Sequence, residues 1–293
     1  MLHFITYLIF RTIKFFLKKL PYFLNRAFGI FLGKVSWKVL KSRRSYVIDN
    51  LRKSSLFDPN HPEEVEAIAK KVFTEAGITL TECLCLEKFT KAWKNRLSYD
   101  LKDFENAKKT AKERGLIIVA HHWGNWELLS MVLSKISPNT LAVGQTIKNP
   151  FINSWVKKMR EKFFTNVSNK KDFLSQALKT LKKKGLVTIL VDQNAGDHGI
   201  PISFMGRKAQ SFTTHAILSI KTNAPLLLVY NQRDKNGYHT VDFSLMIYPE
   251  NFSSAKDKKS AIIDMTQLCL DSLESKIKET PERWFWFHRR WKI

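Results

Sequence analysis

Residues 115–136 read GLIIVAHHWGNWELLSMVLSKI, an apolar run, a short polar turn and a second apolar run. The segment GLIIVAHH (115–122) is short and rich in β-branched residues, which is typical of a fully buried strand. WELLSMVLSKI (126–136) is typical of a helix. Because a strand that leads directly into a helix is the repeating unit of α/β proteins, this stretch predicts the fold class.

The same alternation continues along the chain. Further buried strands are expected at LAVGQ (141–145), GLVTILVDQ (185–193) and PLLLVYNQ (225–232). We therefore expect an α/β fold with a mostly parallel central sheet flanked by helices. The other expected elements are helices over 63–90, 153–164, 172–184 and 212–222, a late strand over 237–248 that is a candidate for antiparallel pairing, and a closing helix over 254–278.

The composition is that of a globular protein with a strong positive charge. The 293 residues include 49 Lys and Arg against 26 Asp and Glu, a formal net charge of +23, and 44% hydrophobic residues. This balance excludes a wholly disordered chain. The charge excess predicts an anionic partner, which by composition alone is nucleic acid, an acidic protein or an anionic membrane. Three cysteines predict neither a disulfide framework nor a zinc site.

The first 48 residues carry ten Lys and Arg and no acidic residue. Cations recur at helical spacing on one face and apolar residues lie largely off that face: Arg11, Lys14 and Lys18 against Phe4, Leu8, Phe15 and Phe16. This pattern predicts a helix that lies in a membrane interface, with its cations toward anionic headgroups. A core helix with a solvated basic face and a short, tilted membrane span are the alternatives. No small-residue cleavage site follows, so we expect no exported signal segment.

These patterns divide the chain into two parts. Residues 1–45 are expected to form a basic, membrane-associating helical arm, and residues 46–293 an α/β domain. No internal repeat or low-complexity tract interrupts the second part.

His122 and Glu127 are the main candidates for chemistry. His122 stands at the carboxyl end of a predicted strand, where α/β sheets place their ligands. Gly124 permits a sharp turn, and Glu127 then falls in the first turn of the next helix. Across such a corner a carboxylate can fix the imidazole tautomer, so that the other ring nitrogen takes a proton from a hydroxyl group. The alternative is a core histidine beside a capping glutamate. His121, on the opposite face of the strand, is expected to support the site.

A second carboxylate is expected at the same sheet edge. Asp192 ends the predicted strand 185–193, where it could pair with Arg160 or orient a sugar hydroxyl group. The alternative for Asp192 is a cap on the loop that follows the strand.

Basic residues supply further candidates. Arg207 and Lys208 precede the helix expected from residue 211, and with its amino terminus they could hold a phosphate or form a solvated turn. Residues 148–184 carry eleven Lys and Arg against two acids, which suits an acidic carrier protein or a solvated surface. No H-E-x-x-H motif or third ligand predicts a metal site.

Several segments are specific enough to identify a family resemblance. The terminal PERWFWFHRRWK (281–292) is the most specific, because such an ending is hard to meet by chance. The others are SRRSYVIDNL (42–51), the H-x4-E motif HWGNWE (122–127), NPFINSWVKKMR (149–160) and LVDQNAGDHGIPISFMGRKAQS (190–211). With these segments the chain resembles, over nearly its whole length, the late acyltransferases of lipid A biosynthesis. These lauroyl and myristoyl transferases are similar to the wider glycerolipid acyltransferases.

The resemblance implies that His122 and Glu127 form the catalytic dyad and that Arg160 and Asp192 match two further functional positions. It implies a membrane-bound O-acyltransferase on the cytoplasmic side of the Gram-negative inner membrane. The enzyme would transfer a fatty acyl chain from acyl carrier protein to a hydroxyl group of a lipid A precursor in lipopolysaccharide biosynthesis. The implied partners are the carrier protein, the precursor and membrane lipids, with no cofactor.

Three other functions are weighed against this one. The first is an acyltransferase of the same fold with another glycolipid acceptor, such as a phosphatidylinositol mannoside. The second is a non-catalytic, basic membrane-surface protein. The third is a nucleic-acid-binding protein, which the charge favours but for which no helix-turn-helix, RNP or zinc-finger signature is present; we expect no nucleic-acid partner.

Overall fold

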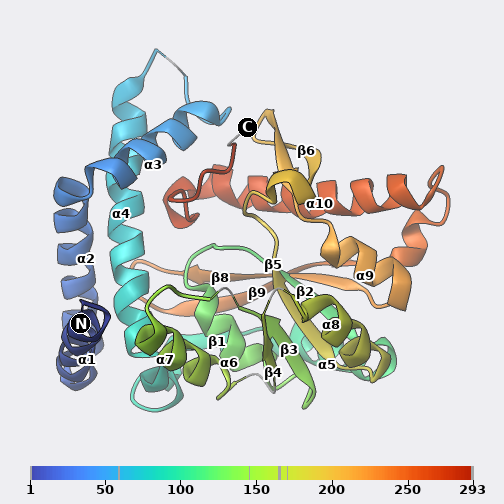
Figure 1. Cartoon of the computed structure of the whole chain (residues 1–293), viewed down its shortest axis with the longest axis horizontal. Helices are drawn as coiled ribbons and strands as arrows, with labels where there is room; N and C mark the ends of the chain where they lie inside the picture. Colours follow the sequence, from blue (N-terminus) through green and yellow to red (C-terminus); the bar gives the residue numbers. More distant parts are fainter. Residues whose placement is uncertain (1, 59, 145, 164–165, 170, 292–293) are drawn as a thin grey trace.

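The computed structural model describes residues 2–58, 60–144, 146–163, 166–169 and 171–291. The centre of the molecule is a seven-stranded sheet (Figure 1). All neighbouring strands in it are parallel except β8 and β9, which are antiparallel. The predicted α/β class and the mostly parallel sheet are therefore confirmed. In spatial order the strands are β1 (Leu97–Tyr99), β9 (His239–Ile247), β8 (Leu226–Arg233), β2 (Leu116–Ala120), β5 (Leu186–Leu190), β3 (Thr140–Val143) and β4 (Asn166–Ser168).

Helices cover both faces of the sheet (Figure 1). The strand β2 shows why, because Ile117 and Val119 enter one core and Ile118 and Ala120 enter the other. A strand that is apolar on both sides requires helices on both faces of its sheet. On the first face lie α8 (Phe173–Lys182), α9 (Thr214–Thr222) and α10 (Lys258–Glu279), and on the second α5 (Leu101–Arg114) and α6 (Leu129–Leu133).

The remaining elements build one end of the molecule and the connections. The helices are α1 (Leu2–Lys19), α2 (Tyr22–Val39), α3 (Lys41–Lys53), α4 (Pro62–Leu84) and α7 (Pro150–Arg160). A separate antiparallel hairpin joins β6 (Ile200–Phe204) to β7 (Arg207–Ser211). Short 3-10 helices are η1 (Leu86–Thr90), η2 (Lys94–Arg96), η3 (Trp126–Leu128), η4 (Gly196–His198), η5 (Pro249–Phe252) and η6 (Pro281–Arg283).

Two expected elements differ in detail. The helix predicted over 126–136 begins with the 3-10 turn η3 and continues as the short α6. The segment before residue 211 is the strand β7 rather than a loop, and α9 begins only at Thr214. Parts of other predictions lie outside the described residues, namely Gln145 of an expected strand, Phe164 of an expected helix and Lys292 of the terminal motif.

The N-terminal helices pack onto the domain. α1 lies against α7, where Phe10 meets Trp155 with ring centroids 4.9 Å apart. α2 crosses α4 at very short distance, because a Cβ atom on Gly77 would lie 2.2 Å from the carbonyl oxygen of Gly29. Glycine at this crossing therefore lets the two backbones touch. The predicted boundary after residue 45 falls inside α3, whose Val47 belongs to the main core.

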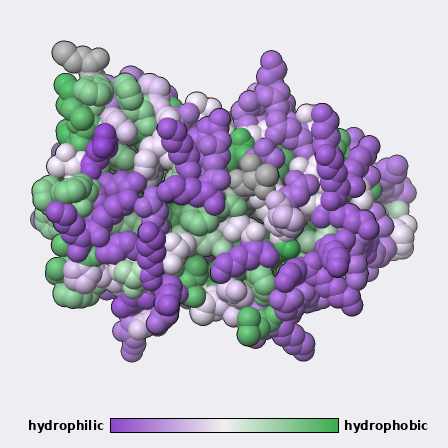
Figure 2. Space-filling model, turned by 90° about the horizontal axis from the view of Figure 1, so that it is seen from below, coloured by the Kyte–Doolittle hydropathy of each residue, from purple (hydrophilic) through white to green (hydrophobic). Residues whose placement is uncertain are grey.

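The faces of α1 are arranged differently from the sequence expectation. Phe15 and Phe16 are exposed as expected. Two of the three cations, however, contact the rest of the protein: Lys14 lies 4.2 Å from the ring centroid of Trp155, and Lys18 forms an ion pair of 2.9 Å with Glu87, whereas Arg11 is exposed. The two lysines turn inward because an indole face and a carboxylate are available beside them. Figure 2 shows hydrophobic residues gathered at the end formed by α1 and α2. Within the described residues, no helix is sufficiently long and apolar to cross a bilayer.

A buried ionic cluster joins α2 and α4 to the sheet. Glu82 of α4 is fully buried and accepts hydrogen bonds from Tyr22 (2.7 Å) and Arg233 (2.6 Å), and His239 Nε2 lies 3.2 Å from it. Burial alone would raise the pKa of Glu82, but the charges of Arg233 and His239 and the hydrogen bonds lower it to about 2. The carboxylate therefore stays ionised inside the protein because its partners surround it.

We predict that Glu82→Gln lowers the free energy of unfolding by about 3 kcal/mol at pH 7, since a pKa near 2 in the folded protein corresponds to that much stabilisation over an ordinary glutamate. The sign follows from the depressed pKa. The contribution is complete above about pH 4.5 and is lost as the pH falls toward 2. Urea unfolding between pH 7 and pH 3 measures it, and the difference between the two proteins should shrink on acidification. Glu66→Gln, at an exposed position of the same helix, is the control. Equal stability of Glu82→Gln and the unchanged protein at pH 7 would contradict the prediction.

Candidate active site

The turn after β2 carries the predicted chemistry. β2 ends at Ala120 and η3 begins at Trp126, so His122 stands in the corner between strand and helix. Gly124 adopts a positive φ of 55°, and a Cβ atom there would lie 2.2 Å from the carbonyl oxygen of Asn231. Only glycine fits this position, because both the backbone angle and the space exclude a side chain.

The carboxylate that bonds to His122 is Asp192. His122 Nδ1 lies 2.8 Å from Asp192 Oδ1, and the backbone N–H of His122 donates to Oδ2 at 3.0 Å. Trp284 Nε1 donates to the same Oδ2 at 2.7 Å. Burial by itself opposes ionisation of Asp192, yet its pKa lies below the ordinary value because His122, His121 and the indole N–H of Trp284 favour the charged form. An ionised Asp192 accepts a hydrogen bond from Nδ1–H and leaves Nε2 as the acceptor nitrogen, 3.4 Å from the side-chain Nε2 of Gln193.

Strand register explains this contact. Ala120 of β2 and Leu190 of β5 are opposite each other in the parallel ladder, so the residues two positions further on emerge at the same level. Asp192 was expected at this sheet edge, and the structure places it there. The pairing of Asp192 with Arg160 that was considered is not the one observed.

Glu127 bonds to Arg160 instead of to the imidazole. Arg160 Nε donates to Glu127 Oε2 at 3.2 Å, and Arg160 NH2 donates to Oε1. The 3-10 turn η3 directs the Glu127 side chain toward the last residue of α7, whereas Asp192 is already in place at Nδ1. The expected hydrogen bond between Glu127 and His122 is therefore absent from the part of the chain that the structure describes. Glu127 pairs with Arg160, and His122 pairs with Asp192.

Both pairs border one pocket. It has an empty volume of about 2380 Å³, including the part open to solvent. His122, Glu127 and Arg160 are among its polar groups, which also include Arg43, Ser130, Thr146, Thr188, Gln193 and Thr214; much of the remaining wall is apolar. The apolar part includes Leu129, Leu133, Ala142, Val143, Leu190 and Phe285. A pocket that combines an imidazole with a large apolar wall suits a substrate with a hydrocarbon chain.

The C-terminal segment completes the turn. The backbone N–H of Phe285 donates to the carbonyl oxygen of His122 at 2.9 Å, and that of Gly124 donates to the carbonyl oxygen of Arg283 at 3.0 Å. The His122 ring lies 4.9 Å from the ring of Trp126 and 6.0 Å from that of Phe285, between centroids. These contacts were not predicted, although the dense aromatic ending of the chain was the available signal.

Asn125 ties the turn to the buried ionic cluster. Its side-chain Nδ2 donates to Glu82 Oε2 at 3.0 Å, and its backbone N–H donates to Asn231 Oδ1 at 3.3 Å. Asn125 is fully buried. The turn is therefore held from behind by α4 and β8 and from the side by the C-terminal segment.

Arg207 and Lys208 lie elsewhere. Both are exposed on β7, where Arg207 Nε donates to the backbone carbonyl oxygen of Lys53 at 2.6 Å. Neither borders the pocket of His122. His121 is buried and stacks on Tyr230 with centroids 5.2 Å apart. Burial lowers the pKa of His121 to about 4, so this imidazole is neutral at physiological pH.

The arrangement can perform general base chemistry without a further protein group. An imidazole whose Nδ1 is held by a buried carboxylate can remove a proton through Nε2. Within the residues that the structure describes, no group of three or more His, Cys, Asp or Glu side chains could hold a metal ion.

Comparisons with known proteins agree with this chemistry. The model of the bacterial lipid A biosynthesis acyltransferase family matches residues 1–293. The chain is 26% identical over 280 residues to the lipid A biosynthesis palmitoleoyltransferase of Escherichia coli (strain K12) and to the lipid A biosynthesis acyltransferase of Shigella flexneri. It is 25% identical over 285 residues to the lipid A biosynthesis lauroyltransferase of the same E. coli strain. Each match covers 94% of this chain and 87% of the relative. The resemblance seen in the motifs is confirmed.

We predict that Asp192→Asn reverses the tautomer of His122. Two N–H groups, from Trp284 and the His122 backbone, would retain the asparagine oxygen, so its NH2 group would face Nδ1 and donate to it. The imidazole proton would then move to Nε2, and any reaction that needs Nε2 as a base should slow roughly 10²–10⁴-fold. ¹⁵N NMR of histidine-labelled protein reports the tautomer directly. Asp197→Asn, at an exposed position of η4, serves as the control. An unchanged tautomer in Asp192→Asn would refute the assignment.

Proposed function

The chain belongs to the bacterial lipid A biosynthesis acyltransferase family, and we propose that it transfers a fatty acyl chain from an acyl carrier protein thioester to a hydroxyl group of a lipid A precursor. The observation that carries this proposal is the His122–Asp192 pair, whose imidazole borders a large and mostly apolar pocket. The pair supplies the base that an alcohol requires, and the pocket accepts the chain that is transferred.

His122 acts as general base and then as general acid. Nε2 takes the proton of the acceptor hydroxyl group while its oxygen attacks the thioester carbonyl carbon. The tetrahedral intermediate collapses with cleavage of the C–S bond, and the imidazolium returns the proton to the departing sulfur. The products are an ester and a thiol. The other ring proton stays on Nδ1 throughout, hydrogen-bonded to Asp192, and the negative charge of Asp192 stabilises the imidazolium.

Arg160 is the group that stabilises the oxyanion in this proposal. Its guanidinium borders the pocket, and two of its nitrogens are already bonded to Glu127. That pairing holds the planar fork in one orientation at the edge of the site. Glu127 thus acts through Arg160, as a positioning residue for the cation, and a cation aimed at a developing negative charge lowers the barrier of acyl transfer.

The donor and the membrane would meet different surfaces. α7 and α8 carry exposed lysines that include Lys157, Lys158, Lys179 and Lys182, a basic surface that suits an acidic carrier protein. α1 and α2 expose large apolar side chains, among them Phe16, Phe23 and Phe31. We propose that this end rests on the inner membrane, with the α/β domain on the cytoplasmic side, so that the lipid acceptor reaches the pocket from the bilayer.

We predict that His122→Ala abolishes acyl transfer while the protein stays folded, because the neighbouring side chain at Nε2, the Gln193 amide 3.4 Å away, is not a base and cannot take the proton. Glu127→Ala should lower the rate roughly 10²–10³-fold, the cost of misplacing one oxyanion donor. The assay is mass spectrometry of the glycolipid product, with circular dichroism as the check on folding. His198→Ala, an exposed histidine on η4, should keep full activity. Full activity of both His122→Ala and Glu127→Ala would overturn the mechanism.

We predict that the double substitution Phe15→Ser and Phe16→Ser weakens binding to vesicles of anionic phospholipid by about tenfold or more, since each ring buries an apolar area in the interface. Sedimentation with phosphatidylglycerol vesicles measures this change. Leu101→Ser removes an equally exposed apolar side chain at the start of α5, away from α1, and should bind normally. If the two variants lost the same affinity, the assignment of the membrane face would fail.

A further inference from the structure

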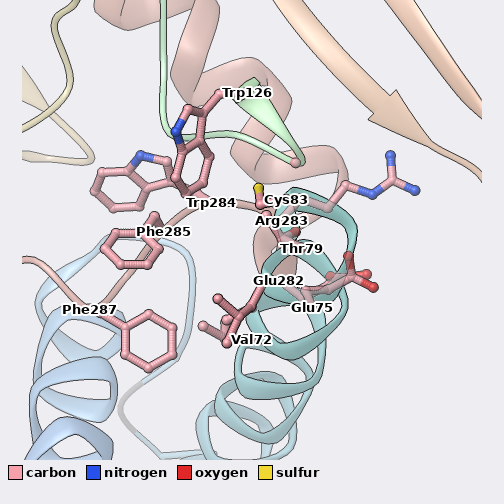
Figure 3. A pocket seen from close by; sticks show the side chains of 13 residues that line it. Val72, Glu75, Thr79, Cys83, Trp126, Glu282, Arg283, Trp284, Phe285 and Phe287 are labelled. Atoms are coloured by element: carbon pink, nitrogen blue, oxygen red, sulfur yellow. The ribbon is translucent and has the colours of Figure 1, made fainter. Parts of the chain in front are cut away.

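A second apolar cleft lies beside the catalytic pocket, between α4 and the C-terminal segment. Figure 3 shows the rings of Trp126, Phe285 and Phe287 facing α4. The cleft has an empty volume of about 690 Å³, including its open part. α4 contributes Val72, Ala76 and Cys83 to its wall, and Leu80, which is 53% exposed, lies at its rim.

The wall of this cleft offers little to a polar molecule. Two of its three charged members already have other contacts: Glu75 bonds to Arg233, and Arg283 donates to the carbonyl oxygen of Arg233. Burial raises the pKa of the Cys83 thiol, so this group is neutral. The remaining wall is mostly ring faces and aliphatic side chains. Binding a hydrocarbon chain removes this apolar surface from water and is therefore favourable.

The cleft and the catalytic pocket share one wall. Trp126 and Phe285 border both, with their ring centroids 5.7 Å apart. The same two rings contact the imidazole of His122. Two apolar compartments therefore lie on either side of these two rings, and His122 borders the catalytic pocket.

We propose that the cleft binds the hydrocarbon chain of the acceptor while the donor's acyl chain occupies the catalytic pocket. This inference rests on the proposed function, in which both reacting groups are carried by long chains. Two chains in one compartment would compete, whereas two compartments allow the hydroxyl group and the thioester to reach Nε2 together.

Charge decides which chain enters which compartment. The catalytic pocket is bordered by Arg160 and Arg43, and α7 and α8 next to it carry the basic surface that suits an acidic carrier protein. Glu75, Glu282 and Arg283 border the cleft, and the two carboxylates also border a neighbouring hollow lined by Lys34, Lys38, Lys70 and Lys71. These lysines suit the phosphate group of a glycolipid acceptor. The acceptor chain, which brings no carrier protein, is left for the cleft.

The first test fills the cleft from α4. In Ala76→Trp the indole takes the place of part of the chain, and each methylene lost from an apolar site weakens binding about fourfold. Two or three lost methylenes should raise the KM of the acceptor roughly 15-fold to 60-fold, while the KM of the acyl thioester and the preferred donor chain length stay unchanged. Ala67→Trp adds the same side chain at an exposed position of α4 outside the cleft. Leu80→Glu places a carboxylate at the exposed rim without filling the interior of the cleft, and it should also raise the KM of the acceptor.

The second test does not depend on turnover. A 3-hydroxytetradecanoyl glucosamine phosphate with a diazirine near its chain end should label residues 72–83, Trp284 or Phe287 of the full protein, which border the cleft and not the catalytic pocket. A dodecanoyl pantetheine thioester with the same group should label residues 129–143 or 186–190. Exchanged labelling, or a hydroxyacyl probe that fails to label the cleft, would overturn the inference. If the protein without any substitution showed no acyl transfer, the proposed function would be wrong. The labelling pattern would still show whether the cleft binds the hydroxyacyl chain.

Discussion

The register between β2 and β5 is the constraint on which the site depends. Ala120 and Leu190 lie opposite each other in adjacent parallel strands, so His122 and Asp192 leave the sheet side by side and bond at 2.8 Å. No flexible loop has to close to make this contact. Three N–H groups converge on the Asp192 carboxylate, which keeps it ionised although it is only 2% exposed. The imidazole is thereby held in one orientation just after the carboxyl end of β2.

The turn that carries His122 is held by parts of the chain that are remote in sequence. Asn125 reaches the buried Glu82, which also binds Tyr22 at the start of α2 and Arg233 at the end of β8. The C-terminal segment adds backbone hydrogen bonds to the same turn. The N-terminal helices, the sheet and the last residues of the chain therefore share one buried centre. A carboxylate in such a place is stable only while all its partners are present.

Charged and apolar side chains lie on different parts of the surface. Cations that the sequence places on α1 are partly used within the protein, at Trp155 and Glu87, and what α1 exposes is largely apolar. Basic residues on α7 and α8 remain exposed near the pocket. A net charge of +23 thus serves at least two purposes, internal pairing and an open basic surface. Apolar compartments lie on two sides of Trp126 and Phe285, the rings that contact the imidazole of His122.

The sequence by itself determined the fold class, because runs such as GLIIVA (115–120) are apolar on both faces and must be covered by helices on both sides. It also placed His122 and Asp192 at one sheet edge, since each ends a buried strand, and its motifs identified the family. Only the tertiary structure decided which carboxylate each partner meets: Asp192 bonds to His122 and Glu127 bonds to Arg160. The spacing of these residues along the chain does not predict the pairing, because the pairing depends on the register of β2 against β5 and on where α7 ends. The same holds for the inward lysines of α1 and for the aromatic C-terminal wall, which are set by neighbours that lie far away in the sequence.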